Sequence, residues 1–230
     1  MKKSIFLTLF TIPLTILAGI HLLNDRQFLI ISALVLLQVF LPFFLLFEGR
    51  KPATRTVVML AVLCALAVAG RGAFFWLPQV SPTMAMVIIA GVAMGAETGF
   101  LVGAMTMLAS NLFMGQGPWT PWQMLAMGLV GLLAGAIFYG RKWRARRLWL
   151  VVFGVTATVL VFGAIMNVSF IFMFQGAPTW EMLATAFVLG LPFDLVHAVS
   201  TGVFLFFLAP PFLEKIARIK TKFGIFPHIS

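Results

Sequence analysis

Eight apolar stretches, each close to the length of one bilayer crossing, constrain this chain more than any short motif. A membrane-spanning helix needs about 20 predominantly apolar residues. Little sequence lies between the stretches, so we expect no separate soluble domain. The sequence therefore predicts an all-α polytopic membrane protein whose short fourth segment is tilted, broken or only partly spanning. The segments are approximately 4–23, 28–47, 56–76, 82–95, 97–114, 121–140, 147–173 and 181–210.

Positive charge lies almost entirely on one side of this map. Fourteen of the sixteen Lys and Arg residues precede segment 1, separate segments 2 and 3 or 6 and 7, or follow segment 8. Lys and Arg are enriched in cytoplasmic loops. We therefore expect a multi-pass protein of the bacterial cell membrane with both termini in the cytoplasm. The net charge of +10 then reflects orientation in lipid, and no nucleic-acid partner is expected.

The start of the chain allows a second interpretation. Lys2 and Lys3 followed by an apolar stretch are also typical of a signal peptide. No clear small-x-small cleavage site follows, and a second apolar segment begins almost at once. We therefore expect residues 1–50 to form a hairpin of two hydrophobic helices ahead of a domain at 51–230.

Three outward turns combine aromatic, amide and turn-forming residues, at 76–82, 115–122 and 175–180. Aromatic faces bury ligand surface at low entropic cost, and Gln amides both donate and accept hydrogen bonds. Trp also anchors proteins at membrane interfaces, so any single Trp fits either an anchoring or a binding role. The combination of Trp, Gln and Pro in three turns on one side of the membrane favours a ligand-binding mouth. Asn111 and Asn167 lie in helices that end on this side. The candidate binding residues are Arg71, Phe75, Trp76, Gln79, Asn111, Gln116, Trp119, Trp122, Gln123, Asn167, Gln175 and Trp180.

Two of these turns share a sequence pattern. Residues 110–117 and 169–176 both read S-x-x-F-M-x-Q-G, at an offset of 59 residues. A parallel internal repeat would place two similar turns beside one ligand mouth. Chance similarity in a biased composition is the alternative.

Two further features admit two interpretations each. Ala61, Ala65, Ala69 and Ala73 share one helix face, which allows close approach of another helix, internal or from a partner.

Asp194 and His197 are neighbours on one helix face. They form either a structural pair or the relay of an autonomous proton-coupled transporter.

Motifs for catalysis are missing from the sequence. It contains no phosphate-binding loop, no H-E-x-x-H and no G-x-S-x-G, and its single cysteine, Cys64, permits no thiolate metal cluster. We expect neither an enzyme nor a metal site, and no cofactor of the protein's own.

Four blocks of the chain together resemble a known family. They are the alanine stripe, residues 70–79 with 115–124, and Leu191-Pro-Phe-Asp-Leu-Val-His197. Over about residues 56–215 they resemble the S components of energy-coupling-factor (ECF) vitamin transporters, and are most similar to those for cobalamin (vitamin B12).

The resemblance implies a six-helix S-component-like core preceded here by two extra N-terminal hydrophobic helices. It also implies a subunit that captures a vitamin, here cobalamin, at the outer face and delivers it inward by toppling in the membrane lipid. The implied partners are a transmembrane coupling subunit and two ATPases, with Ala61, Ala65 and Ala69 as the docking face.

Overall fold

The structure is a computed structural model that describes residues 10–19, 30–31, 34–35, 37–38, 54–141, 146–174 and 179–224. Within those residues the regular elements are all helices. Four of the helices are long and apolar enough to cross a membrane, at 54–73, 119–138, 147–173 and 180–223. The all-α polytopic membrane class predicted from the sequence is therefore confirmed.

From residue 54 onward the helix bounds follow the predicted segments closely, with one large exception. The last helix was predicted to end at residue 210, before Pro211, but it runs without interruption to Phe223 and contains three prolines. Each proline removes one backbone hydrogen bond and favours a kink, yet the buried side chain of Ile216 holds the following turns against the bundle. The helices are α3 (Thr54–Ala73), α4 (Thr83–Met94), α5 (Ala96–Met114), α6 (Trp119–Phe138), α7 (Arg147–Ala157), the π-helix η2 (Thr158–Gly163), α8 (Ala164–Phe174) and α9 (Trp180–Phe223).

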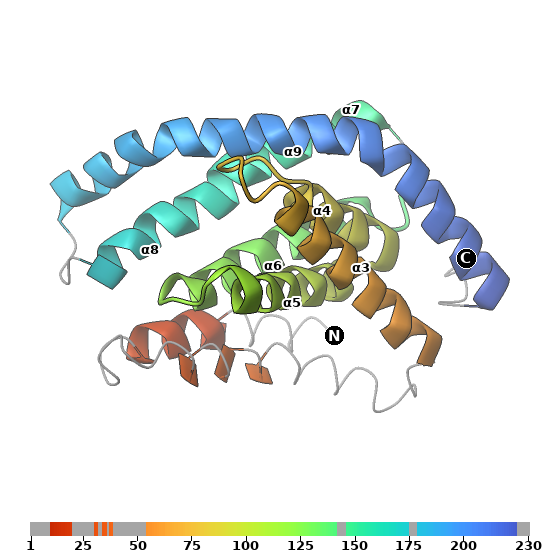
Figure 1. Ribbon diagram of the computed structural model, residues 1–230, viewed down its shortest axis with the longest axis horizontal. Coiled ribbons are helices and arrows are strands. Elements are labelled where there is room, and N and C mark those ends of the chain that lie inside the picture. The colour runs from red at the N-terminus through yellow and green to blue at the C-terminus, as the bar shows by residue number, and fades with distance from the viewer. Residues whose placement is uncertain are drawn as a thin grey trace.

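Helix α4 lies at the centre of the bundle. All twelve of its residues are buried, with α5 and α6 on one side and α9 arching across the other (Figure 1). Twelve residues span about 18 Å, well short of a bilayer's hydrocarbon core. The short length is tolerated because α4 contacts protein on all sides, so its ends need not reach the membrane surfaces.

Glycines bring the backbones of α4, α5 and α6 into direct contact. A Cβ atom added at Gly99 of α5 would lie 2.2 Å from the carbonyl oxygen of Gly131 in α6. One added at Gly91 of α4 would lie 2.3 Å from the same oxygen. Small residues at helix crossings permit such close approach in membranes, where dispersion contacts drive association. These three helices therefore form the rigid centre on which the others pack.

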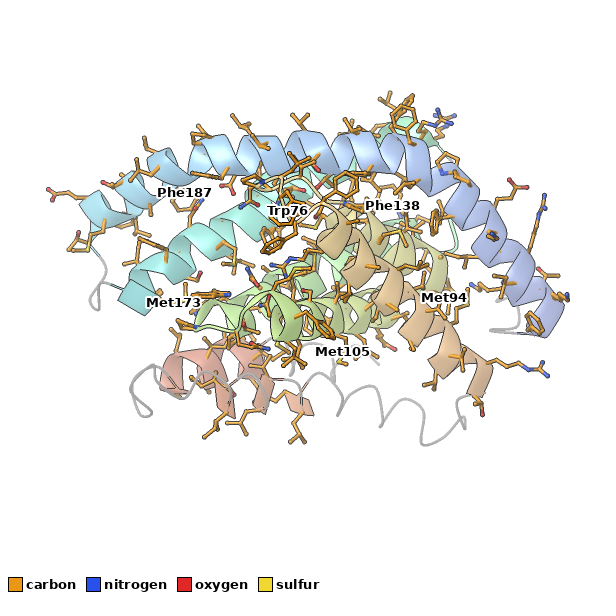
Figure 2. All side chains as sticks on the ribbon, in the orientation of Figure 1. Trp76, Met94, Met105, Phe138, Met173 and Phe187 are labelled. Carbon is orange, nitrogen blue, oxygen red and sulfur yellow. The ribbon has the colours of Figure 1, made fainter. Side chains whose placement is uncertain are left out.

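Large apolar side chains cover the outside of the bundle. Those of α9 include Phe187, Val188, Leu195, Val199 and Phe207, all exposed, and Figure 2 shows Phe187 on its long outer helix. Continuous exposed apolar surface of this kind marks contact with lipid or with another membrane protein.

The predicted N-terminal hairpin lies mostly outside the described residues. Its described part is a short apolar helix, Phe10–Gly19, with a few residues that follow. Ile12, Ile16, Ile31 and Val35 are buried and belong to the same apolar core as the bundle, and Figure 1 shows the helix below α5 and α6. The division into domains at residues 1–50 and 51–230 stays a prediction.

Replacing Gly131 with Ala tests the central crossing. The new methyl would press on the backbone of α5, which cannot move aside as a flexible side chain can, so we expect a loss of about 1–3 kcal/mol of stability. Thermal unfolding of the purified protein in mild detergent measures the change. Gly72→Ala is the control, because its Cβ would meet only the end of the Met114 side chain at 3.5 Å. Equal stability of the two variants would contradict the proposed role of the crossing.

Candidate functional site

A cavity of about 450 Å³ opens where the last turns of α3 and α5 and the first half of α6 face η2, the first turn of α8 and the first half of α9. The connection between α3 and α4 forms part of its wall. Polar side chains contribute to the lining about as much as apolar and aromatic ones, so the cavity is more polar than a usual small-molecule pocket. The charged, imidazole and amide side chains that line it are Arg71, Gln79, Asn111, Gln123, Asn167, Asp194 and His197.

One wall is a hydrogen-bonded network centred on Asn111, which is 1% exposed. Its Oδ1 accepts a hydrogen bond of 2.7 Å from Nη1 of Arg71, which also donates to Ser110. Its Nδ2 donates to Oγ1 of Thr120 at 2.9 Å and to Oε1 of Gln123 at 2.8 Å. The network ties the last turn of α3 to α5 and to the first turns of α6. Arg71 has five N–H donors, so its guanidinium can still offer hydrogen bonds to a ligand.

The opposite wall carries a carboxylate. Asp194 of α9 accepts a hydrogen bond of 2.9 Å from Nδ2 of Asn167 in α8. Both side chains fit against glycines: a Cβ at Gly163 would lie 2.6 Å from the Asp194 carboxylate, and one at Gly190 would lie 2.1 Å from Oδ1 of Asn167. Gly163 ends the π-helix η2, a type of irregularity that is frequent at functional sites. The cavity thus has a cation on one side and a carboxylate on the other.

The connection between α3 and α4 is fixed to the bundle at several points. The backbone N–H of Ser81 donates to Oγ of Ser200 at 3.1 Å, and Oγ1 of Thr83 donates to the carbonyl oxygen of Ala67 at 3.3 Å. Phe74 packs edge-on against Phe204, with ring centroids 5.2 Å apart. These contacts hold the aromatic residues of the connection beside the cavity.

Seven of the binding residues proposed from the sequence lie around this cavity, and they come from four separate stretches of the chain. They are Arg71, Phe75, Gln79, Asn111, Trp119, Gln123 and Asn167.

The other five candidates are placed elsewhere or are not described. Trp122 is buried and stacks on Phe172, and Gln116 donates to the carbonyl oxygen of Leu108. Trp76 and Trp180 are 85% and 86% exposed, and Figure 2 shows Trp76 on the connection between α3 and α4. Gln175 lies outside the described residues.

Apart from Asn167, the wall from η2, α8 and α9 is the part that sequence reasoning missed. Phe162, Met166 and Phe193 line it, together with Asp194 and His197. The sequence predicted Asp194 and His197 to be either a structural pair or a proton relay, and not binding residues. In the described residues no hydrogen bond joins these two; the His197 ring instead packs edge-on against Phe162, with centroids 5.1 Å apart.

The arrangement is suited to binding. Flat aromatic faces, one guanidinium, one carboxylate and four amides can hold a polar heterocycle by stacking and hydrogen bonds. Among the described residues there is no group of three His, Cys, Asp or Glu side chains placed to hold a metal ion.

Comparison with known proteins gives one family and one group of relatives. The family model described as "ECF-type riboflavin transporter, S component" matches residues 51–216. UPF0397 proteins of Aliivibrio fischeri, Aliivibrio salmonicida and Vibrio atlanticus are 34% identical over 88 residues, which is 36% of this chain and 48% of each relative. The chain thus spans about half the length of the curated relatives it matches. No solved structure gives a significant match.

Substitution of Asn111 tests the network. Asn111→Leu leaves Arg71 and Gln123 without their buried partner, so we expect a loss of about 1–3 kcal/mol of stability. In Asn111→Asp the carboxylate still accepts from Arg71, and the Thr120 hydroxyl and a flipped Gln123 amide can donate to it. Thermal unfolding in detergent should therefore show the Leu variant well below the Asp variant. Equal midpoints would mean that the network contributes little.

Proposed function

Because the chain belongs to the ECF-type riboflavin transporter S component family, we propose that it captures a water-soluble vitamin in the cavity beside Arg71 and Asp194. A substrate-binding subunit of this type is not itself a hydrolase, which agrees with the missing nucleotide motifs. The observation that supports the proposal most strongly is the cavity itself, because it places convergent polar groups inside an apolar bundle. We propose that the cavity opens toward the outer face and that both termini lie in the cytoplasm, following the distribution of Lys and Arg.

The size and chemistry of the cavity favour riboflavin as the ligand. A volume of about 450 Å³ lies in the lower half of the range for small-molecule pockets, roughly 300–1,000 Å³. A flavin offers a flat ring for the aromatic walls and a ring edge of alternating carbonyl and N–H groups. Its carbonyls would accept hydrogen bonds from Arg71 or Gln123, and an N–H would donate to Asp194. The family description points to the same vitamin.

Cobalamin, the ligand expected from the sequence, is the second candidate. A corrinoid has several times the volume of a flavin, so most of it would lie outside the described cavity. The exposed aromatic side chains beside the mouth favour it: Phe75 is 57% exposed and Trp76 is 85% exposed. These faces would cover the part of a large ligand that protrudes.

We further propose that the alanine stripe of α3 docks on a transmembrane coupling subunit that works with two ATPases. Ala61, Ala65 and Ala69 are exposed, whereas the buried face of α3 carries Met59, Leu63 and Ala67 among others. Internal packing therefore does not occupy the stripe in this structure. A flat, small-residue face can accept a second helix at close distance.

Ligand binding separates the two vitamins. Purified full-length protein should bind radiolabelled riboflavin saturably at submicromolar concentration, with no competition from excess cobalamin. Asp194→Asn should weaken binding by roughly tenfold, the effect of losing one charge-assisted hydrogen bond. Saturable binding of cobalamin with none of riboflavin would reverse the assignment. Uptake into proteoliposomes driven by a pH gradient without a partner would instead favour the proton-coupled transporter using Asp194 and His197.

Enlarging the alanine stripe tests the docking face. Ala65→Leu with Ala69→Leu should block close helix approach and abolish co-purification with the coupling subunit, while vitamin binding is retained. Ala136→Leu with Ala184→Leu is the matched control, because both of these alanines are exposed on other helices. The docking assignment would be contradicted if the Ala65/Ala69 variant lost vitamin binding as well as the complex with the coupling subunit. It would also be contradicted if the two double variants assembled with the coupling subunit equally well.

A further inference from the structure

A second cavity lies far from the vitamin site, between the first half of α3 and the last turns of α9. It is a groove of about 770 Å³. Figure 1 shows the start of α3 and the end of α9 at the same end of the molecule. Arg55 joins the two helices there, donating from Nη1 to the carbonyl oxygen of Phe223 at 3.0 Å. The groove therefore closes at one end and opens along its length.

The walls of the groove are almost entirely apolar. Val58, Val62 and Leu66 come from α3, while Phe212 and Ile219 come from α9. Val58 is 56% exposed and Val62 is 50% exposed. In a membrane such a surface is filled by hydrocarbon or by another apolar segment.

Two cations, Arg55 and Lys215, are among the lining residues, and both are exposed. Among the described residues the ion pair found is Arg218 with Glu214, and neither Arg55 nor Lys215 has a carboxylate within ion-pair distance. The Phe223 carbonyl oxygen accepts one hydrogen bond from Arg55. The Arg55 guanidinium therefore keeps further N–H groups for a second acceptor. The groove thus combines an apolar trough with positive charge at its border.

This combination matches one class of partner. Basic pockets between membrane helices on the cytoplasmic side bind anionic lipid head groups, and an acyl chain fits an apolar trough. The distribution of Lys and Arg puts this end of the molecule at the inner leaflet. A helix of a partner protein would fill the apolar part but would leave Arg55 and Lys215 without a counter-charge.

We propose that the groove between α3 and α9 binds an anionic phospholipid of the inner leaflet. One acyl chain lies against Val58 and Val62, and the phosphate contacts Arg55 and Lys215. The site is independent of the vitamin cavity and does not rest on which vitamin is bound.

Native mass spectrometry of the full-length protein tests this site. Protein reconstituted in vesicles of equal parts phosphatidylglycerol and phosphatidylcholine, then extracted in mild detergent, should retain phosphatidylglycerol in excess. Arg55→Gln with Lys215→Gln should lower the retained phosphatidylglycerol by roughly tenfold, since each cation near a membrane surface strengthens binding of anionic lipid severalfold. Arg146→Gln with Arg147→Gln removes the same charge at the start of α7, outside the groove, and should leave retention unchanged.

Filling the trough provides a second, charge-neutral test. Val62→Trp keeps both cations but occupies the space of the acyl chain, so retained phosphatidylglycerol should fall as well. Three results would each overturn the proposal. The wild-type protein could retain phosphatidylglycerol and phosphatidylcholine equally, or the Arg55/Lys215 and Arg146/Arg147 variants could lose phosphatidylglycerol equally. The third is unchanged phosphatidylglycerol retention in Val62→Trp. Loss of coupling-subunit assembly in Val62→Trp with lipid retention intact would assign the groove to a protein partner instead. Vitamin binding, measured in parallel, stays unchanged in every variant if the two sites are independent.

Discussion

Direct backbone contact among α4, α5 and α6 is the constraint on which the rest of the structure depends. Lipid offers no hydrophobic driving force between apolar helices, so association relies on close packing. Gly91, Gly99 and Gly131 provide it, because each lacks the Cβ that would meet a neighbouring backbone. The close crossing of α5 and α6 also sets the distance between Asn111 and Gln123, on which the polar wall of the cavity depends.

The two charged walls of the cavity are supported in different ways. Arg71 is held by side chains of α5, so its position follows from the rigid centre. Asp194 is held by Asn167 and by the space that Gly163 and Gly190 leave open, so its position depends on how α8 packs on α9. A ligand that contacts both walls therefore couples the rigid centre to the two outer helices.

Sequence reasoning predicted the class, most helix bounds and the part of the chain that contains the cavity, because apolar length and the placement of Lys and Arg are local signals. It could not decide the role of each Trp. Trp122 and Trp180 share an aromatic turn signature, but one is buried in the core and the other is exposed, which depends on tertiary packing. The contribution of Phe162 and Phe193 was missed because nothing local marks which face of an apolar helix meets a cavity. The end of α9 was placed too early because the prediction followed apolar length, and charged residues such as Glu214 and Lys215 begin soon after residue 210 although the helix continues.

The 44 residues of α9 give it a contour length of about 66 Å, roughly twice the thickness of the hydrocarbon layer. No tilt within the ordinary range for membrane helices, about 0–40°, shortens it enough to fit. As one straight span α9 would therefore exceed the hydrocarbon layer, and Figure 1 shows that it instead arches over the bundle. The last turns, with Lys220 and Lys222, are the polar end, so this part of α9 is the one suited to the head-group region, where charged side chains reach water.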